Sequence, residues 1–108
     1  AELNNNKLKT TRRIGFLLLK NFTMISLASA IEPLRMANQL SGQELYDWFT
    51  ITETGEAMAA SDGLNITPDL GMGDAVDLDA VIVVGGVNIT RNYTTAEVKW
   101  LQMLLDVI

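Results

Sequence analysis

The sequence contains neither cysteine nor histidine, and only two prolines interrupt its 108 residues. Without cysteine the chain has no disulfide, no thiolate nucleophile and no cysteine-ligated metal. Without histidine it has no imidazole base, which excludes Ser-His-Asp and Cys-His catalysis within the chain. Any catalysis would have to rest on carboxylates, lysine, tyrosine and hydroxyl groups.

Positive charge is scarce and unevenly placed, with 8 basic residues against 13 acidic ones and a net charge of −5. Five of the basic residues lie within the first 20 positions, where Glu2 is the only acid: Lys7, Lys9, Arg12, Arg13 and Lys20. The rest of the chain is strongly acidic. An acidic surface repels the phosphate backbone, so direct nucleic-acid binding by this chain is disfavoured.

Long apolar runs are also missing, because no stretch approaches the roughly 18 residues that cross a membrane. The basic start and the apolar residues 14–19, followed by Ala28-Ser29-Ala30, resemble a secretory leader with its cleavage site. Lys20 ends the apolar run after six residues, fewer than the roughly seven that a leader needs. We therefore expect a cytoplasmic protein without membrane association.

The first half of the chain changes its hydrophobic period twice. Residues 1–11 are polar and predict a flexible lead-in, and the continuous apolar run 13–19 predicts a buried strand. Three- and four-residue spacing then predicts a helix from about residue 24 to 40, ended by Ser41-Gly42. The alternative is a helix that begins at the capping box Ser29–Glu32 and carries Pro33 near its start.

The second half alternates between strand and helix signals. They predict, in order, a strand at 46–52, a hairpin of 57–61 and 64–67 around Asp62-Gly63, a loop or short helical turn at 68–78, a strand at 79–84 ended by Gly85-Gly86, and a helix that follows the capping box Thr94–Glu97. Buried strands that alternate with helices favour a doubly wound, flavodoxin-like α/β fold. We expect a mostly parallel sheet with helices on both faces, plus the hairpin.

Only three core strands are predicted, which is few for an open parallel sheet with edges to protect. We therefore expect residues 12–108 to form the N-terminal half of a larger domain. A small, complete domain is the alternative.

Doubly wound sheets bind ligands beyond the carboxyl ends of their strands. The candidate ligand contacts are the residues that follow the first and last predicted strands: Asn21, Phe22, Ser26, Gly85, Gly86 and Asn88. The two glycines would let the backbone approach a ligand closely. Alternatively, they only form the turn that leaves the strand.

No metal or cofactor is expected. Asp69, Asp74, Asp77 and Asp79 crowd together in the sequence, but their spacing does not fit a calcium-binding loop. Gly71-Met-Gly73 lacks the third glycine and the preceding strand of a dinucleotide-binding turn.

Four segments together carry a resemblance to a known family: residues 13–19, 22–38, 61–68 and 79–86, and most specifically Ile31-Glu-Pro-Leu-Arg-Met-Ala-Asn38. From about residue 12 onward the chain resembles the N-terminal class I glutamine amidotransferase-like (ThiJ/PfpI-type) domain of AraC-family transcriptional regulators. It is most similar to the regulators of glycine betaine and carnitine catabolism. The resemblance implies a domain that senses a small effector and forms a homodimer, while helix-turn-helix motifs outside this chain bind DNA.

The resemblance does not extend to catalysis. In the enzymatic relatives an acidic side chain early in the first helix partners a nucleophilic cysteine, and the aligned position here holds Ser26. The cysteine position would lie beyond Ile108. We therefore expect a non-catalytic sensor, with Gly85-Gly86 marking the backbone of the ancestral site. A truncated amidase or hydrolase of the same superfamily and a small flavodoxin-like interaction module are the alternatives.

Overall fold

The computed structural model describes residues 11–107, with side chains through residue 104. Of the predicted lead-in only Thr11 falls in this range. The secondary-structure elements are, in chain order, β1 (Arg12–Leu18), α2 (Met24–Ser41), β2 (Tyr46–Thr52), β3 (Met58–Ala59), β4 (Asn65–Ile66), β5 (Leu70–Gly71), a 3-10 helix (Met72–Asp74), β6 (Ala80–Val84), a second 3-10 helix (Ile89–Arg91) and α3 (Thr95–Val107).

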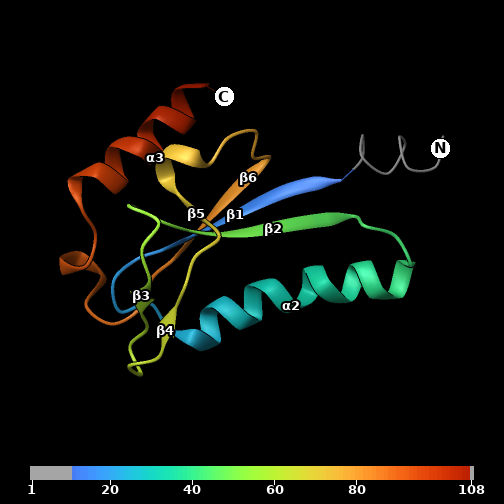
Figure 1. Cartoon of the computed structure of the whole chain (residues 1–108), viewed down its shortest axis with the longest axis horizontal. Coiled ribbons are helices and arrows are strands. Elements are labelled where there is room, and N and C mark those ends of the chain that lie inside the picture. Colours follow the sequence, from blue (N-terminus) through green and yellow to red (C-terminus); the bar gives the residue numbers. More distant parts are fainter. Residues whose placement is uncertain (1–10, 108) are drawn as a thin grey trace.

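The sheet has the strand order β5-β2-β1-β6, and every pairing within it is parallel (Figure 1). From β1 the chain passes through α2 to β2 on one side, and it later returns to place β6 on the other side of β1. The direction of winding therefore reverses at β1. This arrangement confirms the predicted doubly wound, mostly parallel α/β fold.

The central strand β1 explains why helices cover both faces of the sheet. Successive side chains of a strand point to opposite faces. Phe16 and Leu18 belong to one buried cluster with Leu27 of α2, whereas Leu17 and Leu19 belong to a second cluster with Trp100 of α3. Figure 1 accordingly shows α2 below the sheet and α3 above it.

The longer of the two helices considered for residues 24–41 is the one observed, and Pro33 lies inside it. It ends at Gly42, whose φ of 71° is left-handed and whose N–H donates to the Asn38 carbonyl. The Asn38 side chain then fixes the next strand. Its Nδ2 donates to the Tyr46 carbonyl, and its Oδ1 accepts the N–H groups of Leu45 and Tyr46 at 2.9 and 3.0 Å.

The hairpin is confirmed, with β3 and β4 antiparallel around Asp62-Gly63. Gly63 has a φ of 88°, a conformation that glycine adopts without steric cost. The hairpin is anchored to the sheet layer because Ala60 is buried and the Ser61 N–H donates to the Phe22 carbonyl at 2.8 Å.

One element was missed, because part of the segment predicted as a loop or helical turn forms the edge strand β5. Two residues are too short to show a period. Tertiary contacts create the strand: the Asp69 carboxylate accepts the Thr50 N–H at 2.8 Å, and Gly71 packs closely against the Thr54–Gly55 backbone, where a Cβ would lie 3.0 Å from the Gly55 nitrogen.

The opposite edge strand, β6, is apolar but incompletely covered. Ile82 and Val83 point to opposite faces of the sheet and are 40% and 41% exposed. Within residues 11–107 no strand pairs with the outer edge of β6.

Candidate functional site

The two segments expected to bind a ligand meet where the winding of the sheet reverses. The Leu19 N–H donates to the Val84 carbonyl at 3.1 Å, and the Thr23 N–H donates to the Gly85 carbonyl at 3.2 Å. Phe22 and Gly86 form an isolated antiparallel bridge. The structure therefore brings the exits of β1 and β6 together, as expected for neighbouring parallel strands.

Gly86 is required there by the chain's own backbone. A Cβ at this position would overlap the Asn21 carbonyl oxygen and lie 2.9 Å from the Thr23 nitrogen. The loop after β1 therefore occupies the space that a side chain at position 86 would need. Gly85 differs, because a Cβ there would meet only the flexible end of the Ile89 side chain.

The other candidates lie in different surroundings. Phe22 is fully buried in the cluster on the α2 face, so its side chain is part of the core. Ser26 is exposed, and its Oγ accepts a hydrogen bond from Thr23 Oγ1 at 2.5 Å. Asn21 and Asn88 have left-handed φ values of 61° and 54°. Asparagine tolerates this conformation, so both residues form the turns that leave the strands.

A hollow of about 330 Å³ opens at this end of the sheet. It lies between the exits of β1 and β2, the hairpin strand β3, and the segment that leads into α3 (Figure 1, left). Its lining residues are Lys20, Asn21, Glu53, Met58, Ala59, Arg91, Asn92, Tyr93, Thr94 and Glu97. Of the six candidates predicted from the sequence, only Asn21 lines it.

The lining carries both signs of charge. Lys20 and Arg91 contribute cations, and in the described part of the chain neither forms an ion pair. Glu53 and Glu97 contribute carboxylates, and Tyr93 adds an aromatic ring that is 50% exposed. A hollow with this lining can bind a polar ligand that carries a cationic group, a carboxylate or both.

The two carboxylates are connected through Thr94. Thr94 Oγ1 donates to Glu53 Oε1 at 2.8 Å and accepts the Glu97 N–H at 3.1 Å, while the Thr94 N–H donates to Glu97 Oε1 at 2.8 Å. The last two bonds form the predicted capping box of α3. Only 3% of Glu97 is exposed. This burial raises the pKa of Glu97, the backbone N–H and the hydroxyl of Thr94 next to the carboxylate oppose the rise, and the nearby Glu53 charge adds to it.

The raised pKa of Glu97 predicts a stability that falls as the pH rises. The folded state holds the Glu97 proton more tightly than the unfolded chain does, so stability is lost as the pH rises from the ordinary value through the raised one. The substitution Glu97→Gln keeps the acceptor for Thr94 and removes the titration. Urea unfolding between about pH 4 and pH 7 should therefore show a smaller decline for Glu97→Gln than for the wild type.

Glu56→Gln, at an exposed position, is the control for the loss of one negative charge. If Glu97→Gln and Glu56→Gln change the pH dependence equally, burial does not set the titration of Glu97.

Sequence reasoning missed five of the charged and polar residues of the hollow: Lys20, Glu53, Arg91, Tyr93 and Glu97. A usable signal was present for Glu97, because its capping box marks a helix start. Helices that follow parallel strands begin at the carboxyl edge of the sheet, which is the edge where a ligand site was expected. Glu53 and Lys20 follow strands at the same edge.

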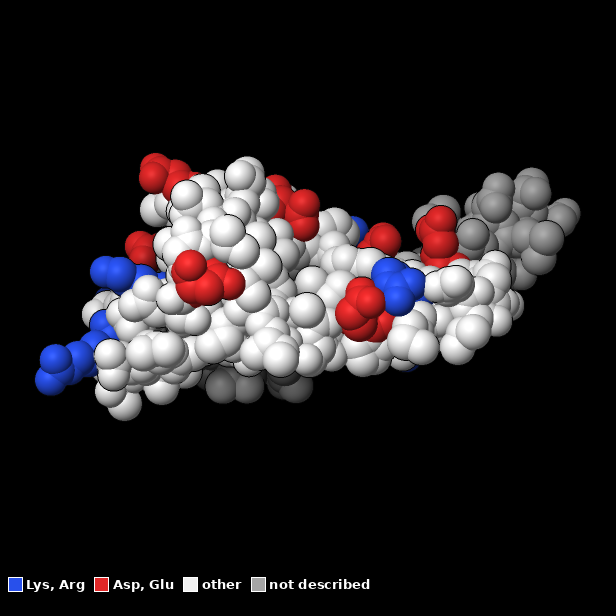
Figure 2. Space-filling model, turned by 90° about the horizontal axis from the view of Figure 1, so that it is seen from below, with Lys and Arg blue, Asp and Glu red and all other residues white. Residues whose placement is uncertain are grey.

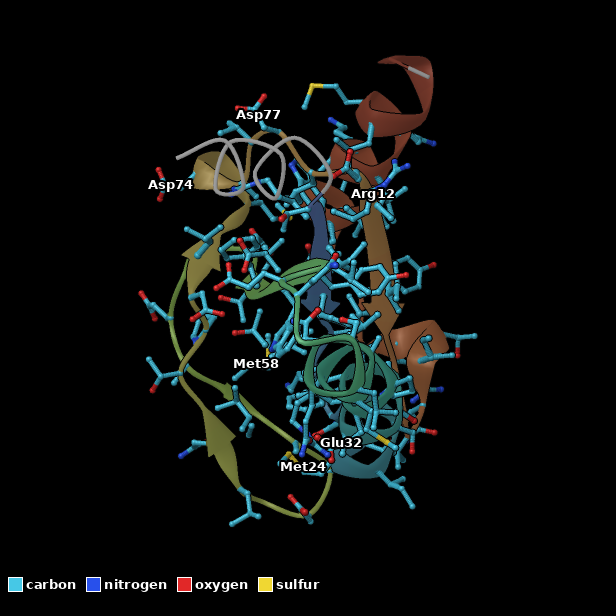
Figure 3. The ribbon with its side chains drawn as sticks, turned by 90° about the vertical axis from the view of Figure 1, so that its right-hand side faces the viewer. Arg12, Met24, Glu32, Met58, Asp74 and Asp77 are labelled. Carbon is cyan, nitrogen blue, oxygen red and sulfur yellow. The ribbon has the colours of Figure 1, made fainter. Side chains whose placement is uncertain are left out.

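The acidic residues that crowd together in the sequence separate in the fold. Asp69 and Asp79 each accept a backbone N–H, from Thr50 and Arg13 respectively, and Figure 3 shows Asp74 and Asp77 at separate points on the outside of the molecule. Among residues 11–107 no group of three acidic side chains is arranged to hold a metal ion. Within the same range no helix is long and apolar enough to cross a membrane.

The fold is shared with solved proteins. An AraC family transcriptional regulator from Pseudomonas putida matches with a TM-score of 0.75 and 24% identity, over 88% of this chain and 51% of that one. A ThiJ/PfpI family protein from Pseudomonas syringae matches with a TM-score of 0.56 and 20% identity, over 74% of this chain and 31% of that one. The chain therefore has the amidotransferase-like fold of the ThiJ/PfpI proteins.

No profile of a known protein family matches the chain. Individual relatives do. The HTH-type transcriptional regulator GbdR of Pseudomonas aeruginosa strain UCBPP-PA14 is 60% identical over 94 residues, which are 87% of this chain and 26% of the relative. The HTH-type transcriptional regulator CdhR of Pseudomonas aeruginosa strain PAO1 is 36% identical over 89 residues, which are 82% of this chain and 26% of the relative.

These findings confirm the resemblance found in the sequence. The chain is related to HTH-type transcriptional regulators, and its fold is the amidotransferase-like fold also found in a solved AraC-family regulator. It spans 26% of the length of the two curated relatives.

Proposed function

We propose that this chain is an effector-sensing and dimerising domain of an AraC-family transcriptional regulator. The observation that carries the proposal is the 60% identity to GbdR over 87% of the chain. The domain binds no DNA itself. It controls helix-turn-helix motifs that lie outside this chain, in agreement with its net charge of −5.

In this proposal residues 12–108 are the N-terminal part of the sensor domain. The half-exposed Ile82 and Val83 on the unpaired edge strand β6 support a larger sheet, because apolar sheet edges normally pair or are covered. The chain also matches 51% of the solved Pseudomonas putida regulator.

The domain acts without catalysis and in the cytoplasm. Cysteine and histidine are absent from its sequence. Ser26, at the position of the acidic partner in the enzymatic relatives, is exposed and hydrogen-bonded to Thr23. It therefore offers no carboxylate to activate a nucleophile.

The effector site is the hollow at the exits of β1 and β2. Glycine betaine and carnitine, the effectors that the resemblance suggests, each combine a quaternary ammonium group with a carboxylate. The ammonium group is attracted by the Tyr93 ring and the Glu53 carboxylate, and the carboxylate by Lys20 and Arg91. Binding then acts by population shift, because it favours the domain arrangement in which these groups converge.

Calorimetry of the full-length protein with glycine betaine tests this site. We expect binding in the wild type and a loss of about tenfold in affinity for Arg91→Ala, since one charge-assisted contact is removed. Arg35→Ala is the matched control, because Arg35 pairs with Glu32 at 2.9 Å on α2, outside the hollow. Absence of binding heat at millimolar glycine betaine and carnitine would contradict the effector assignment.

Dimerisation is supported by the outer surface of α2. Ile25, Met36 and Leu40 are 76%, 48% and 80% exposed there. Figure 2 views the molecule from below, the side on which Figure 1 places α2, and much of that view is free of charged side chains. Sedimentation of the full-length protein as a monomer would contradict this part of the proposal.

A further inference from the structure

Thr94 connects the start of α3 to the end of β2 by a direct hydrogen bond. Its hydroxyl group donates to Glu53 Oε1 and at the same time accepts the Glu97 N–H in the first turn of the helix. One hydroxyl therefore serves both as the cap of α3 and as its link to the sheet.

This link is unusual within the fold because α3 is otherwise held by apolar packing. Trp100, Leu101 and Leu104 pack against the cluster that contains Leu17 and Leu19 of the β1 segment. Among the described residues, the Thr94–Glu53 bond is the only side-chain hydrogen bond between the segment 94–104 and the rest of the chain. The polar attachment of α3 thus depends on a single exposed bond.

The partner at the other end of the bond is firmly placed. Thr52, next to Glu53, is 2% exposed. Its Oγ1 donates to the Glu56 carbonyl at 2.9 Å and accepts the Gly55 N–H at 3.0 Å, which fixes the turn after β2. The turn that contains Glu53 is therefore held by hydrogen bonds that do not involve α3.

Glu53, Thr94 and Glu97, which these hydrogen bonds connect, all line the hollow. A ligand that fills the hollow excludes the water that competes for the exposed Thr94–Glu53 bond. Hydrogen bonds shielded from water are stronger, because the local dielectric is lower. Occupancy of the hollow and attachment of α3 should consequently favour each other.

We propose that the hydrogen-bonded residues Glu53, Thr94 and Glu97 form a latch that holds α3 to the sheet. A ligand in the hollow strengthens this latch. Thr94 is its positioning residue. The coupling to ligand rests on the function proposed above, whereas the latch itself exists in the ligand-free protein and can be measured without any effector.

The ligand-free test is a double-mutant cycle in the full-length protein, read out by hydrogen exchange of the amides in the first turns of α3. Glu53→Ala should speed this exchange about threefold in the wild-type background and leave it unchanged in the Thr94→Val background. Thr94→Ser, which keeps the hydroxyl, should restore the effect of Glu53→Ala. An equal effect of Glu53→Ala in the wild-type and Thr94→Val backgrounds would overturn the latch.

The ligand test adds saturating glycine betaine. Exchange in the first turns of α3 should slow in the wild type and in the control Thr95→Val. In Thr94→Val it should stay unchanged at a glycine betaine concentration raised until calorimetry shows that variant saturated, since Thr94 lines the hollow and its loss also weakens binding. Equal slowing in wild type and Thr94→Val overturns the coupling and leaves the proposed effector site intact. Absence of binding heat overturns the effector assignment and the coupling to glycine betaine, and the ligand-free cycle still decides the latch.

Discussion

Replacing Gly86 with alanine is expected to destabilise the domain by about 1–3 kcal/mol, the usual cost of forcing extra atoms into a packed site. The new Cβ would overlap the Asn21 carbonyl oxygen and approach the Thr23 nitrogen to 2.9 Å. Both are backbone atoms. They cannot rotate away, so the loop after β1 must shift as a whole.

The shift should also change the shape of the hollow, since Asn21 lines it and Phe22 forms a backbone bridge with Gly86. We therefore expect Gly86→Ala to lower both the free energy of unfolding, measured in urea, and the affinity for the effector. This result would identify the glycine as the residue that allows the two strand exits to meet.

Two other glycines serve as controls. The Cβ introduced by Gly85→Ala would contact only the flexible Ile89 side chain, and the Cβ introduced by Gly73→Ala would have no such neighbour within 4 Å. We expect a smaller loss for Gly85→Ala and a change within about 0.5 kcal/mol for Gly73→Ala. If Gly86→Ala is no more harmful than Gly73→Ala, backbone contact is not what requires glycine at position 86.

Replacing Phe22 with alanine should cost about 3–5 kcal/mol of unfolding free energy, because a fully buried aromatic ring leaves a large cavity. Phe22 lies in the core cluster with Phe16, Leu18 and Leu27, between β1 and α2. Its backbone carbonyl also receives the Ser61 N–H of the hairpin. Loss of the ring should loosen both attachments, and urea unfolding followed by tryptophan fluorescence measures the effect.

Tyr93→Ala is the control, because Tyr93 lines the hollow and is 50% exposed. It should leave the unfolding free energy within about 0.5 kcal/mol of the wild type and weaken effector binding. The sequence alone suggested Phe22 as a ligand contact. A Phe22→Ala protein that keeps its stability and loses only binding would support that role over the core role.

Local sequence signals predicted the elements of this fold well. The capping box Thr94–Glu97 and the Asp62-Gly63 turn are each set by residues within a few positions of one another. Their hydrogen bonds and dihedral preferences involve only the residues of the motif itself. The continuous apolar strands, combined with amphipathic helices, then left the doubly wound class as the favoured arrangement.

Signals of this kind fail where distant segments decide. The strand β5 exists because Gly71 lies against Gly55 and because Asp69 holds Thr50. The contacts that create β5 have no periodic trace in the sequence.

The absence of cysteine and histidine, the α/β class and the expectation of a ligand site at the carboxyl edge of the sheet follow from the sequence itself, because composition, hydrophobic period and the alternation of strands with helices are visible along the chain. Which side chains meet at that edge is decided only by the tertiary structure. Lys20, Glu53, Arg91 and Glu97 come from four separate segments, and the reversal of winding at β1 brings them to one hollow. The same reversal buries Phe22 and makes Gly86 necessary, since the two strand exits occupy adjacent positions in the sheet.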